Sequence, residues 1–223
     1  IHESGMRVHF NSPEVIDKFV EDYINKPHSE LLRQEEYKDF ERKFYSSSTQ
    51  SLITNFESCH ILELESVRIG FACINTSWRC SRTLPEDRLV FGTVQVSRGA
   101  HYLRSKGCDY IIGLLHHPFD TVSQIERQLT ETMLSRAKYD AALFGHVHHG
   151  RSHLSMGNNG NLFISIARTG FSKPSEKVEK YNSGYTILDF DFNKPSVECS
   201  FRTYVFDRNE FDRDIYLAKN GSV

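Results

Sequence analysis

Two short apolar runs, each followed by histidines, constrain the fold of this chain more than any other feature. Tyr110 to Leu115 leads into His116 and His117, and Ala141 to Phe144 leads through Gly145 into a second group of histidines. Apolar runs of this length, bounded by turn residues, are typical of buried strands in a parallel sheet. Both runs should therefore lie inside an α/β domain.

The segment between the two runs has the spacing of a crossover helix. From Thr121 to Ala137, apolar side chains recur on one side of the expected helix, namely Val122, Ile125, Leu129, Met133 and Leu134. A strand, a helix and a second strand in this order form a βαβ unit with parallel strands. In open α/β sheets a site lies beyond the carboxyl ends of the strands, which is where both histidine groups stand.

Histidine at the ends of two parallel strands favours a metal site, because neutral imidazole is the commonest metal ligand in proteins. His146 and His148 are separated by one residue, so in extended backbone their side chains point the same way. Gly145 would let the chain turn sharply after its strand, and Pro118 would do so after the first group. The alternative is that these histidines are polar loop residues without a ligand.

The two histidine blocks resemble those of the calcineurin-like metallophosphoesterases. His-His-Pro stands at 116–118, and Gly-His-Val-His stands at 145–148. By this resemblance His116 and His146 would bind one metal of a dinuclear pair, and His148 would bind the other. The resemblance implies two divalent or trivalent ions (Mn, Fe or Zn) and hydrolysis of a phosphomonoester or phosphodiester, with the phosphoester as the expected partner.

The other blocks of the family pattern are absent from this chain. Asp-x-His, Gly-Asp-x-x-Asp and Gly-Asn-His-Asp/Glu do not occur, and the pattern does not require His117 or His149 as ligands. We therefore expect the chain to be the C-terminal part of a longer protein, inactive alone, whose upstream segment completes the domain and its ligands. No general acid is assigned. The alternative is a degenerate, non-catalytic domain that keeps the scaffold for binding or regulation.

Charge and cysteine content narrow the partners. With 27 basic and 29 acidic residues, the chain has no electrostatic case for nucleic acid or membrane binding, although nucleic acid stays open as a substrate. No apolar stretch is long enough to span a membrane. The five cysteines form no Cys-x-x-Cys motif, which favours a reducing compartment, and we predict a cytoplasmic location.

Residues 1–50 are expected to form a helical segment. Ser12 followed by Pro13 is a good helix start, and a second helix begins near Ser29 with its apolar side chains at helical spacing. This segment is either a pair of surface helices on a core or a cap over the site that selects substrates.

A β-rich core is predicted from 51 to 206. Val67 to Ile74 reads as a strand, with a partner strand before it, and it runs into Asn75-Thr76-Ser77-Trp78. A similar stretch occurs in resembling proteins, which implies that Asn75 and Trp78 approach the substrate. The alternative is that Asn75 makes a turn and that Trp78 fills core.

The remaining elements complete an α/β fold with mixed sheets. We predict a helix over Gly92 to Lys106, a hairpin over 152–166, two strands over 185–206 and a charged surface tail over 207–223. The resemblance implies an α/β/β/α sandwich, to which the whole chain contributes part of one domain. Unpaired sheet edges would then make the chain prone to associate when expressed alone.

Overall fold

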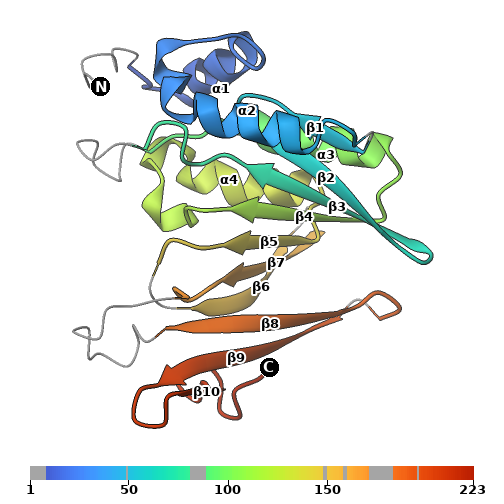
Figure 1. The fold of residues 1–223 in the computed structure, drawn as a ribbon, viewed down its shortest axis with the longest axis vertical. Helices are drawn as coiled ribbons and strands as arrows, with labels where there is room; N and C mark the ends of the chain where they lie inside the picture. The colour runs from blue at the N-terminus through green and yellow to red at the C-terminus, as the bar shows by residue number, and fades with distance from the viewer. Residues whose placement is uncertain are drawn as a thin grey trace.

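The computed structural model describes residues 9–48, 50–80, 89–147, 150–157, 160–170, 183–194 and 196–223. They form an α/β fold in which helices and a small sheet pack on a larger mixed sheet (Figure 1). This agrees with the fold class predicted from the sequence. Among these residues, no helix combines the length and the apolarity that crossing a membrane requires.

The larger sheet has seven strands in the order β1-β2-β3-β4-β5-β7-β6. Its central strands β3, β4, β5 and β7 are parallel, whereas β1, β2 and β6 pair antiparallel at the two edges. The predicted βαβ unit is therefore confirmed. The strand bounds are β1 Ser51–Ile53, β2 Ser58–Leu64, β3 Val67–Ile74, β4 Tyr110–Leu115, β5 Ala141–Phe144, β6 Arg151–Gly157 and β7 Gly160–Ile166.

Two α-helices pack on one face of this sheet and bury its main core, namely α3 (Val94–Ser105) and α4 (Gln124–Arg136). The crossover helix α4 is shorter than the predicted range, Thr121 to Ala137, because a separate one-turn helix, η3 (Phe119–Thr121), precedes it. The buried face of α4 also differs from the predicted apolar stripe: Glu126 is buried and Leu129 is exposed. Both carboxylate oxygens of Glu126 accept main-chain N–H bonds from the segment before α3, which explains its burial.

A second sheet packs on the opposite face of the larger one. It has three antiparallel strands in the order β10-β9-β8, namely β8 Gly184–Asp191, β9 Ser196–Val205 and β10 Glu210–Arg213. Ile112, Ala141 and Phe163 of the larger sheet share an apolar cluster with Cys199 and Phe201 of β9. The two sheets form a sandwich in which the larger sheet is mixed and the smaller one is antiparallel.

The prediction of a surface tail over 207–223 is wrong. This segment adds β10 to the small sheet, and its end returns to β9, where Val223 exchanges main-chain hydrogen bonds with Cys199. Asp214 is buried and forms an ion pair with Arg168 at 2.5 Å. These contacts are not visible in the sequence, because charged segments are usually exposed to solvent.

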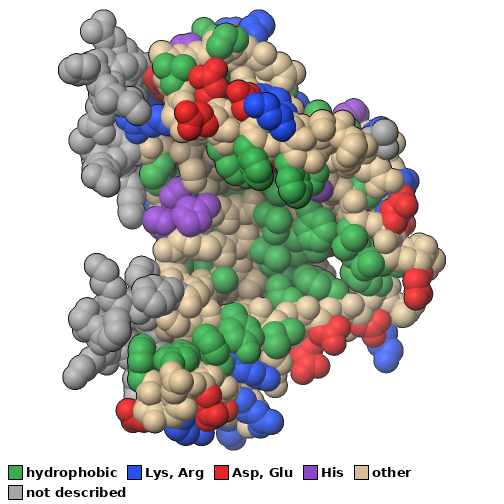
Figure 2. Space-filling model, in the orientation of Figure 1, with side chains coloured by type: hydrophobic (Ala, Val, Ile, Leu, Met, Phe, Trp, Pro, Cys, Tyr) green, Lys and Arg blue, Asp and Glu red, His purple; other side chains and the backbone are tan. Residues whose placement is uncertain are grey.

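The N-terminal helices are α1 (Pro13–Asp22), η1 (Ser29–Gln34) and α2 (Glu35–Phe44). Ser12 caps α1 as predicted, since its Oγ accepts from the amide of Val15. Figure 2 shows a hollow with apolar side chains between the N-terminal helices, at the top of the view, and the small sheet. Phe40 and Phe44 of α2 are 59% and 66% exposed and line a pocket of about 410 Å³ there. The apolar side of α2 thus faces a hollow rather than a packed core.

Candidate metal site

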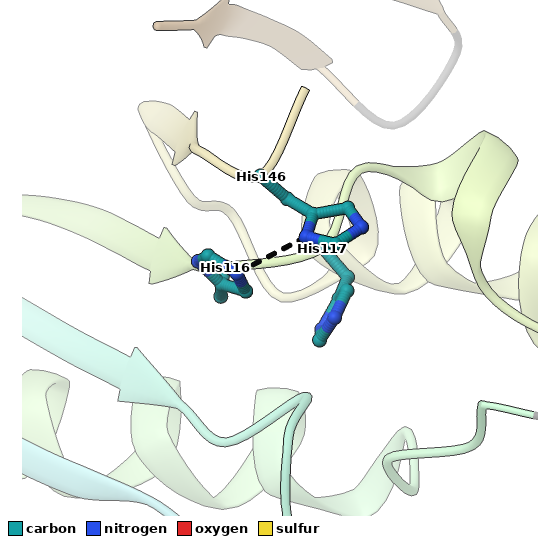
Figure 3. A group of neighbouring side chains, drawn as sticks. All are labelled: His116, His117 and His146. Atoms are coloured by element: carbon teal, nitrogen blue, oxygen red, sulfur yellow. Dashed lines mark hydrogen bonds between the residues drawn. The ribbon is translucent and has the colours of Figure 1, made fainter. Parts of the chain in front are cut away.

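The parallel pairing of β4 and β5 determines the position of the histidines. Leu115 is paired with Phe144, so the two strands end side by side. His116, His117 and His146 consequently meet just beyond the strand ends (Figure 3), each with one ring nitrogen within 4.8 Å of those of the other two.

The rings of His116 and His146 contact each other directly. His146 Nδ1 lies 3.2 Å from His116 Nε2, and the amide of Gly145 donates to the carbonyl of His116 at 3.2 Å. One of the two ring nitrogens therefore carries a proton and donates a hydrogen bond, which the other nitrogen accepts. A bound metal ion would take the place of this hydrogen bond, because it uses the same nitrogen lone pairs.

The chain turns sharply at His146 rather than at Gly145, where the sequence placed the turn. His146 has a φ of 68°, in the left-handed region, and Val147 N donates to the carbonyl of Gly145 at 2.8 Å. Such a conformation costs about 1–3 kcal/mol for a residue other than glycine. The fold therefore holds this side chain beside His116 at the expense of stability.

His117 is buried and is fixed by a hydroxyl group. Thr76 Oγ1 lies 2.9 Å from His117 Nδ1 and also accepts the main-chain N–H of His117 at 3.2 Å. A threonine oxygen has lone pairs for both bonds, so Nδ1–H can donate to it and leave the lone pair of Nε2 for a metal ion.

The imidazoles of His116 and His117 are suited to stay neutral, as a metal ligand must be. Burial, with the neighbouring rings of His146 and His116, lowers the pKa of His117 to about 4. Burial and the ring of His146 also lower the pKa of His116. Neither effect depends on a bound ion, so the two groups are prepared for coordination near pH 7.

The structure brings together His116 and His146, which the sequence predicted as ligands, and adds His117, which it did not. His148 and His149 lie outside the described residues. The signal for His117 lies in Thr76, a hydroxyl residue just beyond the neighbouring strand. Three imidazoles that leave other coordination positions open suit a zinc-like ion.

Asn75 is held in a turn and also lines a pocket that reaches the cluster. Its Oδ1 accepts from the amide of Ser77 at 3.0 Å, and its Nδ2 donates to Gln34 Oε1 at 2.6 Å. The pocket, of about 400 Å³, is lined by Asn75 and His116 among others. Trp78 is 2% exposed and donates to the carbonyl of Phe91, so its side chain packs as core.

No protein-family model matches the chain. No curated protein sequence matches it either. Among solved structures it has similarity to "GAP50 the anchor in the inner membrane complex of Plasmodium", with 13% identity and a TM-score of 0.34. The match covers 66% of this chain and 50% of that chain, so the chain aligns with half the length of GAP50. A likeness this weak carries no argument about function.

Proposed function

We propose that the histidine cluster binds a metal ion and that the intact protein hydrolyses a phosphomonoester or phosphodiester at a dinuclear centre of Mn, Fe or Zn. The observation that carries the proposal is the convergence of His116, His117 and His146 at two adjacent strand ends. The phosphoester class rests on the resemblance of the two histidine blocks to those of the metallophosphoesterases.

The three histidines would contribute differently to binding the ion and the substrate. A bound ion polarises a phosphoryl oxygen and offsets the negative charge that repels a nucleophile. His116 and His146 are exposed, where a substrate can reach them, whereas His117 is buried and held by Thr76. The site therefore combines an accessible edge with one rigidly oriented ligand.

A second ion needs ligands beyond these three histidines. Among the described residues, the group that is able to hold a metal contains no carboxylate, and carboxylates balance the charge of such centres. In the proposal, His148 and an upstream segment of the same domain supply the second position, and the chain alone is inactive.

All five cysteines are free thiols, which supports a reducing location such as the cytoplasm.

A non-catalytic binding or regulatory domain is the second candidate. The observation that favours it is that, in the part of the chain that the structure describes, the histidine group contains no carboxylate. In that case the protein would bind at most one ion and would hydrolyse no phosphoester.

The test compares two histidine variants of the protein carrying its full natural sequence. His146→Ala removes one proposed ligand, and His153→Ala removes an exposed histidine of β6 as a matched control. The proposal predicts that His146→Ala loses bound metal and the hydrolysis of 4-nitrophenyl phosphate or its bis ester, while the control retains both. Equal metal content and activity in both variants would overturn it, and metal binding without hydrolysis would favour the second candidate.

A further inference from the structure

The pocket beside His116 lies between two segments that are far apart in the sequence. One wall is made by residues 75–78, which follow β3, and the other by Arg33, Tyr37 and Lys38 of η1 and α2. We propose that this pocket binds the alcohol portion of the phosphoester and that Tyr37 selects alcohols with a flat heteroaromatic ring. The inference rests on the proposed function for the position of the phosphate, but ring binding itself requires no metal.

The ring of Tyr37 is largely open to solvent. Tyr37 is 61% exposed although it lines the pocket, so most of its surface is not covered by protein. Aromatic faces left open in this way stack on flat rings, and such stacking tolerates different ring identities. The pocket volume of about 400 Å³ falls in the range of small-molecule sites.

Two side-chain amides belong to the same lining. Asn75 Nδ2 donates to Gln34 Oε1 at 2.6 Å, and Gln34 Nε2 donates to the carbonyl of Asn55 at 3.3 Å. The NH₂ group of Asn75 has a second hydrogen that its bond to Gln34 does not use. Because Asn75 lines the pocket, its amide is a group there that can hydrogen-bond a ring nitrogen or carbonyl oxygen of a heteroaromatic group.

Two charged side chains of the lining form an ion pair. Lys38 Nζ lies 2.9 Å from Glu41 Oε2 and 3.1 Å from Ser58 Oγ, so its charge and that of Glu41 offset each other inside the pocket wall. The wall beside Tyr37 therefore presents a compensated ion pair, which suits the uncharged ring of the ligand, while its phosphate would lie at the His116 end of the pocket.

A competing ligand would be a phosphoester with a long apolar chain. Tyr37 also lines the pocket of about 410 Å³ beside α2, which is lined further on by Phe40 and Phe44. An apolar chain would lie against these rings, whereas a flat polar ring would stay beside Asn75. The two ligands therefore separate in a binding experiment.

The experiment uses Trp78, the only tryptophan of the chain, as a reporter in the pocket wall. Adenosine monophosphate is titrated in the presence of a chelator, and glycerol 3-phosphate and octyl phosphate serve as comparisons. We expect a saturable change in fluorescence with adenosine monophosphate and weaker or no binding of the other two. Tyr37→Ala should weaken adenosine monophosphate binding roughly tenfold, while Tyr37→Phe should retain it, because stacking needs only the ring.

The controls separate this inference from the proposed function. Tyr216→Ala removes a similarly exposed tyrosine from the C-terminal segment and should leave binding unchanged. Equal affinity of the wild type and Tyr37→Ala, or tighter binding of octyl phosphate, would overturn ring selection. Because a chelator is present throughout, these outcomes are independent of whether the histidines bind metal.

Discussion

Thr76 Oγ1 lies 2.9 Å from His117 Nδ1, and the amide of His117 donates to the same oxygen at 3.2 Å. Thr76 follows β3 and His117 follows β4, so two neighbouring parallel strands join in orienting one imidazole. Partners of this kind fix the tautomer and the direction of a metal-binding histidine. Thr76 is therefore a positioning residue for the proposed ligand.

Replacing Thr76 by valine removes the hydroxyl but keeps the shape of the side chain. We expect the affinity for Zn²⁺ or Co²⁺ to fall roughly 10–100-fold, as is typical when such a partner of a metal ligand is lost. The buried amide of His117 also loses its acceptor, which should cost about 1–3 kcal/mol in unfolding free energy. Thr132→Val, on the exposed side of α4, is the control. A loss of stability with unchanged metal affinity would leave Thr76 a packing role only.

The left-handed conformation of His146 leads to a prediction in which stability and metal binding separate. At a φ of 68°, glycine is unstrained and alanine is not. His146→Gly should therefore be more stable than His146→Ala by about 1 kcal/mol in urea unfolding, while both variants lose metal affinity. Alanine and glycine variants of equal stability would show that the turn is not strained at this residue.

Glu126 should make the stability of the fold depend on pH. Its oxygens accept from the amides of Phe91 and Gly92 at 2.9 Å each, which favours the charged form, but burial outweighs these bonds and raises the pKa to about 7 from 4.5. Between these two values the folded state binds more protons than the unfolded state. The stabilisation is thus complete below pH 4.5 and is lost as the pH rises through 7, by about 3 kcal/mol.

Urea unfolding of the wild type and Glu126→Gln across this pH range tests the sign. The other titrating groups contribute equally to both proteins, so the difference in unfolding free energy isolates Glu126. Relative to the variant, the wild type should become less stable as the pH rises. A difference that is constant with pH would contradict the raised pKa.

The apolar hollow beside α2 predicts association. Phe40 and Phe44 are exposed there, and among the described residues β8 is an edge strand of the small sheet. Sedimentation velocity of the chain should show mass increasing with concentration, and Phe44→Lys should shift it toward the monomer. Ile215→Lys alters a similarly exposed side chain of the C-terminal segment and should change nothing. A monomeric wild type at high concentration would contradict this prediction.

The parallel strands of the core were the most predictable part of the fold. The apolar runs at 110–115 and 141–144 coincide with β4 and β5, because each run is bounded by turn residues and is buried on both faces. The pairing of these strands then follows from the crossover helix. His116 and His146 were found by the same logic, since their positions depend only on where the strands end.

Contacts between distant segments were not predictable from periodicity. Glu126 and Asp214 are buried by main-chain amides and by Arg168, partners that no local pattern reveals. His117 joins the cluster because Thr76 holds it, from 41 residues away in the sequence. From the sequence alone each of these polar residues would be expected at the surface. In the structure each is buried with a specific partner.

The most direct test of the central claim is elemental analysis of purified protein, as this chain and in its full natural sequence, with aryl phosphate hydrolysis measured alongside. We expect this chain to bind about one ion through its histidine cluster without turnover. The full sequence should bind about two ions and hydrolyse the substrate, as dinuclear centres do. No metal in either form would contradict the claim, and the histidines would then be packing residues.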